Sequence, residues 1–362
     1  MPQPDLHIGI VGCGKMGANI FHFLSDFPFR LTLVCRSFEG AEKINKTFIR
    51  KLDRSLRLGA IDQAQYDFKR SRTSVSNALA DLGSCDLVIE SIAENREFKK
   101  ALFEKLDQIV SGNCILSSNS SSIPPSEIVP HEKRNHNTLG LHFFYPVSLV
   151  NLVEVNTLNS TSPDTIDRVR SFLLQLKKFH MVFSEEENFT INKLLLPLQA
   201  GCCFLHRNYG LAYSDLDEMV KDTLQFPMGM FAFFDHVGID TMLVSVRNYV
   251  NDVASDPFYQ SLIVELENLV VRGKLGRKSG AGFFQYEDTI ASAAHEDEVT
   301  EQTISPAEIK AMLIRWYLDA VDKLLAKGIC TKEELEHIVR EYMNAGQSPF
   351  LLAKQNDYQF SV

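Results

Sequence analysis

The segment GIVGCGKMGANI, residues 9–20, constrains the fold of this chain more than any other stretch. Its glycines stand in G-x-G-x-x-G spacing, after an apolar run typical of a strand and before an amphipathic stretch typical of a helix. This order is characteristic of a dinucleotide-binding fold, in which the turn and the helix N-terminus face the pyrophosphate. A purely structural glycine turn is the alternative. We therefore predict that the loop binds a dinucleotide through Gly12, Cys13, Gly14, Lys15, Met16 and Gly17.

The alternation of strand and helix patterns continues to about residue 187. Such alternation predicts parallel strands joined by crossover helices. Beyond Glu187 the strand patterns stop, and a long helical pattern rich in Leu and Phe begins at Ile191. We therefore predict an α/β Rossmann-like domain with a mostly parallel sheet, followed by an all-α C-terminal domain. The strands are expected at 7–12, 31–36, 85–92, 114–119, 138–144, 152–156 and 180–184, and the first helices at 17–25, 39–58 and 62–69.

The helical part contains a weak internal repeat. GLAYSDLDEMV at 210–220 aligns with GICTKEELEHIV at 328–339 with one inserted residue, and an amphipathic helix precedes each copy. Two related helical units are expected to pack as a pair. An acidic stretch rich in Ser and Ala, residues 287–303, is predicted to link them. The predicted domains are 1–187 for the dinucleotide, 188–290 for substrate and dimerisation, and 300–362 for a helical half-repeat.

The charge and cysteine content exclude several classes of protein. The net charge of −9 argues against a nucleic-acid or anionic-membrane binder. The seven cysteines are scattered without a C-x-x-C pair, so neither a disulfide framework nor a metal site is expected. No apolar run reaches the length of a membrane span and no signal peptide is expected, so we predict a cytoplasmic protein with free thiols.

One stretch departs from this acidic balance. Residues 36–72 contain ten Lys and Arg against five Asp and Glu. Two interpretations stay open: a solvated helix face, or a surface that attracts a phosphorylated ligand.

The segment LTLVCRS, residues 31–37, ends where many dinucleotide-binding proteins place an acidic residue. That acid binds the adenosine ribose diol and would repel a 2′-phosphate. Here Cys35 stands in its place and Arg36 and Ser37 follow, and a guanidinium can pair with phosphate through two hydrogen bonds. We predict that the cofactor is NADP(H) rather than NAD(H). The alternative is that Arg36 stacks on adenine while NAD binds without the acid.

Seven stretches of the chain together point to one known family. They are IGIVGCGKMGANI, CDLVIESIAENREFKKALFEKLD, ILSSNSSSIPPSEI, GLHFFYPVSLVNLVEV, INKLLLP, FPMGMFAFFDHVGID and GKLGRKSGAGFF. In these stretches, and over nearly its whole length, the chain resembles the 3-hydroxyacyl-CoA dehydrogenase family. The resemblance implies an N-terminal Rossmann-like domain, a helical C-terminal domain that forms a homodimer, and hydride transfer between NAD(P)(H) and the 3-hydroxy or 3-keto group of an acyl-CoA.

The resemblance also implies the site residues. His142 and Glu154 correspond to the family's catalytic pair, in which a carboxylate orients an imidazole that moves the proton of the 3-hydroxyl. Ser121 and Asn192 match the remaining catalytic positions, where they would hydrogen-bond the substrate oxygen. The residues expected near the cofactor's nicotinamide ribose are Glu94, Lys99 and Asn119, with Lys278 reaching over from the second domain. Ser121 is also expected to contact the cofactor. Ion pairs on a helix surface, and a helix cap at Ser121, are the structural alternatives.

Two departures from the family pattern surround the predicted cleft. Glu187 and Asn188 replace a usual Pro-Gly pair, and Tyr145 replaces a usual Asn. Two other functions remain open: dehydrogenation of a free 3-hydroxy acid, such as a sugar acid or carnitine, and a cofactor-binding protein without turnover.

Overall fold

The computed structural model describes residues 6–249, 257–287, 290–293 and 303–361. The chain divides into two compact units, Met1–Asn188 and Phe189–Val362, and each is described by itself.

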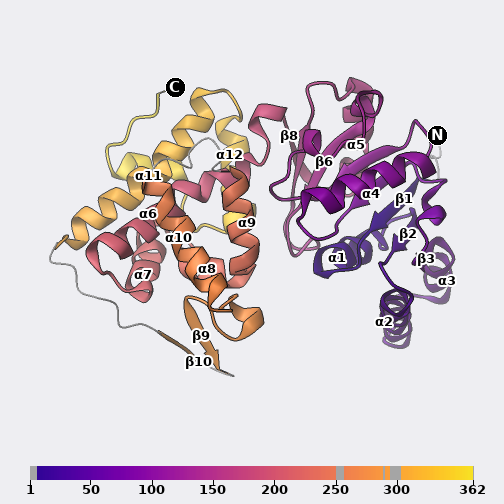
Figure 1. The fold of residues 1–362 in the computed structure, drawn as a ribbon, viewed down its shortest axis with the longest axis horizontal. Helices are drawn as coiled ribbons and strands as arrows, with labels where there is room; N and C mark the ends of the chain where they lie inside the picture. Colours follow the sequence, from indigo (N-terminus) through magenta and orange to yellow (C-terminus); the bar gives the residue numbers. More distant parts are fainter. Residues whose placement is uncertain (1–5, 250–256, 288–289, 294–302, 362) are drawn as a thin grey trace. The chain divides into compact units, whose positions relative to one another are not determined.

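The first unit is built on one eight-stranded sheet (Figure 1). The strand order is β3-β2-β1-β4-β5-β6-β7-β8, and every neighbouring pair is parallel except β6 and β7. The fold class predicted from the sequence is therefore confirmed. The strands are β1 (His7–Val11), β2 (Arg30–Val34), β3 (Thr73–Ser76), β4 (Leu87–Glu90), β5 (Ile115–Ser118), β6 (Thr138–Phe143), β7 (Leu152–Thr157) and β8 (Phe179–Phe183).

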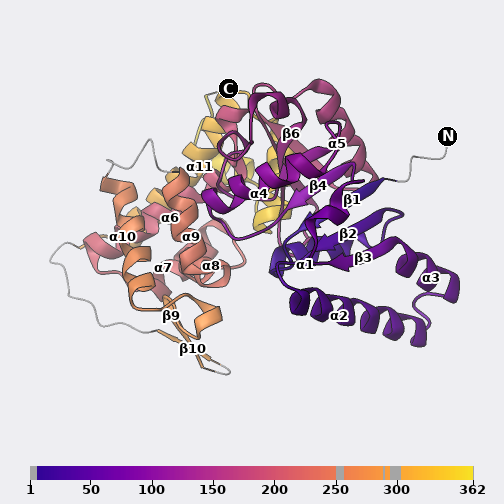
Figure 2. The same ribbon diagram turned by 45° about the vertical axis from the view of Figure 1, so that its right-hand side comes forward.

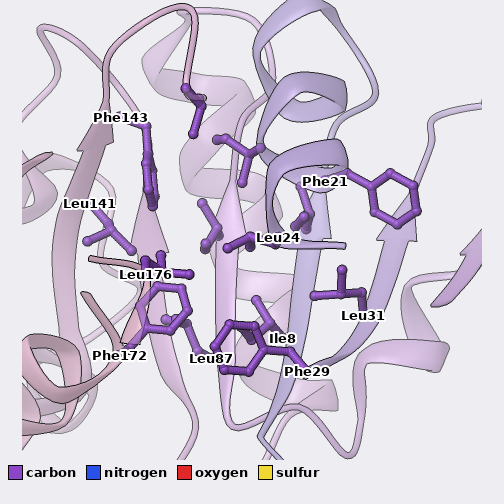
Figure 3. Close-up of a cluster of buried hydrophobic side chains, with 14 of the residues drawn as sticks. Ile8, Phe21, Leu24, Phe29, Leu31, Leu87, Leu141, Phe143, Phe172 and Leu176 are labelled. Carbon is purple, nitrogen blue, oxygen red and sulfur yellow. The ribbon is translucent and has the colours of Figure 1, made fainter. Parts of the chain in front are cut away.

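Helices cover both faces of this sheet. Alternate strand side chains build two cores. Ile8 and Leu31 pack with Phe21 and Phe172 on one face (Figure 3). Val88 belongs to a separate core on the other face. α2 contacts β3 and α3 and is seen along its length in Figure 2. The helices are α1 (Lys15–Leu24), α2 (Phe38–Arg57), α3 (Gln63–Arg72), α4 (Arg96–Ile109) and α5 (Pro163–Gln175).

The second unit is mainly helical. Its helices are α6 (Thr190–Tyr209), α7 (Tyr213–Leu224), α8 (Met230–Val237), α9 (Ile239–Tyr249), α10 (Pro257–Val271), α11 (Pro306–Ala326), α12 (Lys332–Ile338) and α13 (Pro349–Gln355). It also contains an antiparallel pair, β9 (Phe284–Glu287) and β10 (Ile290–Ala293). This pair corrects the expectation that strands stop after Glu187. It also places a strand inside the predicted linker 287–303, whose other residues lie largely outside the described ones.

The two halves of the sequence repeat lie in contact within this unit. α11 packs against α6 and α7, and Gly201 of α6 permits the close approach of Trp316 of α11. A Cβ added at Gly201 would lie 2.2 Å from Cε3 of that indole. The half-repeat 306–355 therefore folds as part of the same unit as α6–α10.

Candidate active site

The glycine loop lies at the carboxyl end of β1, between strands β2 and β4. The chain order reverses at this point of the sheet, which is where open α/β sheets bind their ligands. Gly12 has a positive φ of 109°, and a Cβ there would lie 2.3 Å from the Ser91 carbonyl oxygen. At Gly17 a Cβ would lie 2.0 Å from the Gly12 oxygen, so this glycine allows α1 to pack closely. A Cβ at Gly14 would meet no described atom within 4 Å, so the backbone there is open to a ligand. A dinucleotide pyrophosphate fits this arrangement.

The residues that follow β2 differ in exposure. Cys35 is buried, and burial together with the neighbouring Cys13 thiol raises the pKa of its thiol to about 12. Arg36 is exposed. Ser37 caps the N-terminus of α2, because its Oγ accepts a hydrogen bond from Gly40 N at 3.1 Å. The pKa of Glu39 is lowered by its own backbone N–H and by the Ser37 hydroxyl, so this carboxylate lies beside one of the two predicted phosphate ligands.

His142 and Glu154 face each other on adjacent antiparallel strands. They are directly opposed in the β6–β7 register, and His142 Nδ1 lies 2.7 Å from Glu154 Oε2. Glu154 is fully buried and His142 is 5% exposed, while the Phe144 ring lies 4.3 Å from the imidazole. A buried carboxylate at this distance accepts a hydrogen bond from Nδ1 and thereby orients the ring. The arrangement suits proton transfer at the other ring nitrogen, Nε2.

Three predicted residues lie together after β4 and β5. Glu94 Oε1 accepts hydrogen bonds from the backbone N–H of Ser121 at 3.2 Å and from two neighbouring serine hydroxyls. Burial alone would raise the pKa of Glu94, but Lys99 and the serine hydroxyls outweigh burial and hold it below its ordinary value. Asn119 Oδ1 accepts from Phe143 N at 2.8 Å, which ties the end of β5 to the residue after His142.

Glu90, the last residue of β4, was missed by the sequence analysis. It is fully buried, and Lys99 Nζ lies 2.7 Å from its Oε1 and 3.3 Å from Glu94 Oε2. Ser118 Oγ donates to Glu90 Oε2 at 2.6 Å. Lys99 is only 1% exposed, so its ammonium group is held inside this ion-pair network, which anchors Glu94. A carboxylate at the end of a four-residue buried strand needs a partner, and that requirement was the available signal.

Tyr145 and Lys15 form a further contact beside the glycine loop. The Lys15 ammonium group lies 4.0 Å from the centre of the half-exposed Tyr145 ring. The Val147 N–H donates to Asn19 Oδ1 of α1 at 2.7 Å. The segment after β6 is thus attached to the helix that follows the loop.

The remaining predicted residues, Asn192 and Lys278, belong to the second unit. Asn192 lies in the first turn of α6, where its Nδ2 donates to Tyr249 Oη at 2.9 Å and its Oδ1 accepts from Tyr342 Oη at 3.0 Å. Lys278 makes an ion pair with Asp240.

The described residues contain no cluster of His, Cys, Asp or Glu suited to a metal ion. None of the helices within the described ranges is long and apolar enough to cross a bilayer.

Comparison with known proteins agrees with this geometry. Residues 7–186 match the family model of the 3-hydroxyacyl-CoA dehydrogenase NAD binding domain, and residues 189–286 match that of the 3-hydroxyacyl-CoA dehydrogenase C-terminal domain. A probable 3-hydroxybutyryl-CoA dehydrogenase of Bacillus subtilis is 32% identical over 284 residues, 78% of this chain and 97% of that protein. The mitochondrial hydroxyacyl-coenzyme A dehydrogenase of Rattus norvegicus is 30% identical over 286 residues, 77% of this chain and 91% of that protein.

Solved structures show the same similarity. The (S)-3-hydroxybutyryl-CoA dehydrogenase of Ralstonia eutropha has a TM-score of 0.69 and 30% identity, covering 78% of this chain and 99% of that one. The 3-hydroxybutyryl-CoA dehydrogenase of Escherichia coli has a TM-score of 0.80 at 19% identity, covering 97% of this chain and 91% of that one, and shares its fold.

A Rossmann-like sheet, an open glycine loop and a buried His–Glu pair together define an NAD(P)-dependent oxidoreductase. The two family models together match more than half of the chain, so the chain belongs to the 3-hydroxyacyl-CoA dehydrogenase family.

Proposed function

We propose that this enzyme transfers a hydride between NADP(H), in preference to NAD(H), and the 3-hydroxy or 3-keto group of an acyl-CoA. The observation that carries the proposal is the buried His142–Glu154 pair with its 2.7 Å contact. The nicotinamide supplies the hydride acceptor or donor. The remaining requirement, a proton delivered to or taken from the C3 oxygen, falls to the imidazole.

In the direction of reduction, His142 begins as imidazolium. Its Nδ1–H donates to Glu154, which fixes the ring, and its Nε2–H is transferred to the C3 oxygen as the hydride reaches C3. The keto group thereby becomes a hydroxyl and the histidine becomes neutral. Oxidation runs through the same atoms in reverse, with His142 as the base.

Other residues of the site are proposed to position the reactants. Ser121 and Asn192 would donate hydrogen bonds to the substrate oxygen, whose charge changes during the reaction. Glu94 and Asn119 would contact the nicotinamide ribose, with Lys99 acting through the carboxylate of Glu94 and Lys278 reaching the cofactor from the second unit. The hydrogen bonds from Ser121 N to Glu94 and from Phe143 N to Asn119 support the proximity of these groups within the first unit.

The cofactor preference is proposed from the exposed Arg36 beside the Ser37 hydroxyl. A bidentate guanidinium–phosphate pair would favour NADPH by about 10- to 100-fold, the effect of one charge-assisted contact. Glu39 favours the alternative, NAD(H), because a carboxylate repels a 2′-phosphate and accepts from a ribose hydroxyl.

The test is acetoacetyl-CoA reduction by the wild type and by Arg36→Asp, with NADH and with NADPH. We expect kcat/KM for NADPH to be the higher in the wild type and to fall about 100-fold in Arg36→Asp, with NADH less affected. Equal use of both cofactors by both proteins would contradict the preference. Reduction of acetoacetyl-CoA with NADH but not with NADPH would support the proposed reaction and contradict only the preference for NADP(H).

The CoA thioester is proposed from the basic face of α2. A hollow of about 370 Å³ lies along this helix, lined by Glu39, Glu42, Lys43, Lys46, Thr47 and Arg50. Cations here would attract the phosphates of the CoA nucleotide, which a free 3-hydroxy acid lacks. We expect CoA to raise the Tm of the wild type and to have a smaller effect on a Lys43→Glu/Arg50→Glu double variant. An unchanged Tm in both proteins would favour the free-acid alternative.

A homodimer and a cytoplasmic location remain proposals. The first is supported by the family resemblance, and sedimentation at several concentrations tests it. The second is supported by the seven free cysteines, which suit a reducing compartment.

A further inference from the structure

We propose that Tyr342, in the C-terminal half-repeat, is a positioning residue that holds the amide of Asn192 in its catalytic orientation. The inference rests on the proposed function, in which Asn192 donates a hydrogen bond to the substrate oxygen. It assigns the half-repeat a part in building the active site.

The geometry places the Asn192 amide between two phenols. Tyr342 Oη donates to Asn192 Oδ1 at 3.0 Å, and Asn192 Nδ2 donates to Tyr249 Oη at 2.9 Å. All three side chains are half-buried. A primary amide has two N–H donors, so these bonds engage one N–H and one oxygen lone pair. They fix the amide plane, and with it the direction in which the amide N–H groups point toward the proposed position of the substrate oxygen.

Tyr342 lies in an irregular turn of the backbone. α12 continues into a π-helical turn, Val339–Met343, which ends at Asn344 with a positive φ of 48°. Such turns are rare and frequently occur at functional sites, because the extra residue redirects a side chain. Two residues later, Gly346 N donates to the Gln225 carbonyl at 2.8 Å. The turn is thereby attached to the other half of the repeat, close to α7.

Tyr342 comes from a segment outside the matched family regions. The C-terminal family model ends at residue 286, and Tyr342 is 150 residues from its partner Asn192. The Bacillus subtilis relative matches 78% of this chain over 97% of its own length. The half-repeat therefore contributes a contact to a predicted catalytic residue that lies in the matched region.

The decisive experiment is Tyr342→Phe in the full chain, measured with acetoacetyl-CoA and saturating cofactor. The ring is retained and the hydrogen bond from Tyr342 Oη to Asn192 Oδ1 is lost. Because Asn192 acts on the oxygen whose charge changes, we expect kcat to fall about 5- to 20-fold with KM within about twofold. In an Asn192→Ala background the same substitution should have no further effect, since the group that it orients is absent.

Tyr358→Phe is the matched control. Tyr358 is also a tyrosine of the C-terminal half-repeat, and its Oη donates a hydrogen bond to Asp319 Oδ1 at 2.7 Å. Among the described hydrogen bonds, none joins Tyr358 to Asn192. We expect its kcat to equal that of the wild type. If Tyr342→Phe and Tyr358→Phe have the same kcat, or if the Tyr342 and Asn192 effects multiply independently, the proposal is wrong.

A second readout separates this proposal from the proposed function. The side-chain amide of Asn192, labelled with ¹⁵N-asparagine and identified by its loss in Asn192→Ala, should shift its NMR signal in Tyr342→Phe and not in Tyr358→Phe. If the wild type has no turnover and Tyr342→Phe still shifts the Asn192 signal, the proposed function is wrong and the positioning contact is retained. An unchanged signal would overturn the positioning contact, whatever the activity.

Discussion

Replacing Lys99 by Met tests how the buried charges at the carboxyl end of β4 are balanced. The ammonium group lies 2.7 Å from a Glu90 oxygen and 3.3 Å from a Glu94 oxygen, and the Lys99 and Glu90 side chains are at most 1% exposed. At an effective dielectric constant of 20 the two gross attractions are about 6 and about 5 kcal/mol. Desolvation offsets much of this in the intact network, but removing the lysine leaves two carboxylates without their cation.

Removing one partner of a buried ion pair costs about 3–5 kcal/mol. The hydrogen bonds to Glu90 from Ser118 Oγ and from Ile92 N remain in the variant, so we expect a value near the lower limit, about 3 kcal/mol. Hydrogen exchange of the amides in β4 and β5 measures the opening free energy of this region. Their exchange should accelerate about 100-fold. Lys100→Met is the matched control, because Lys100 is the exposed neighbour on the same helix.

The loss of stability in Lys99→Met should also depend on pH. Lys99 opposes the effect of burial on Glu94, so without it the pKa of Glu94 in the folded protein should rise. The folded variant then binds a proton more readily than the folded wild type, so the stability of the variant relative to the wild type falls as pH rises through that range. We expect the deficit to be larger at pH 8 than at pH 5. Exchange in Lys99→Met within about threefold of Lys100→Met at pH 8 would refute this reasoning.

Two further predictions follow from the glycines. Gly14→Ala should leave the Tm within about 1 °C, because its Cβ meets no described atom within 4 Å, but it should weaken cofactor binding at least 10-fold. Gly17→Ala should lower both the Tm and the cofactor affinity, because its Cβ would lie 2.0 Å from the Gly12 oxygen. Equal Tm losses in calorimetry would contradict this. Gly201→Val should displace Trp316, the only tryptophan of the sequence, and red-shift its fluorescence emission. It should also lower the free energy of unfolding of the second unit by about 1–3 kcal/mol. An unchanged emission spectrum would contradict the packing of α11 on α6.

The fold could be predicted from the sequence largely because its signals are local. The glycine loop, the apolar runs and the helical patterns each lie within a few residues, and the fold class they predicted is confirmed. β3 was missed because Thr73–Ser76 is short, polar and at the edge of the sheet, so it lacks the apolar run of a buried strand. β9 and β10 were missed because they form an isolated pair in a helical unit.

The site could be predicted less completely, since several of its contacts are tertiary. The His142–Glu154 pairing came from the family resemblance, because a spacing of twelve residues has no period that a helix or a strand imposes. Glu90 was hidden in an apolar run, and its partner Lys99 is buried only because α4 packs on that face of the sheet. Tyr342 gives no local signal, since its partner lies 150 residues away.

The most direct test of the central claim compares the wild type with His142→Gln, using acetoacetyl-CoA reduction and a separate titration of cofactor binding. The account predicts that the wild type turns over, and that the variant loses about 10²- to 10⁴-fold in kcat, the usual contribution of one acid–base group, while its cofactor Kd stays within about twofold. A variant as fast as the wild type would contradict the account. So would a wild type that binds the cofactor and reduces no 3-ketoacyl-CoA.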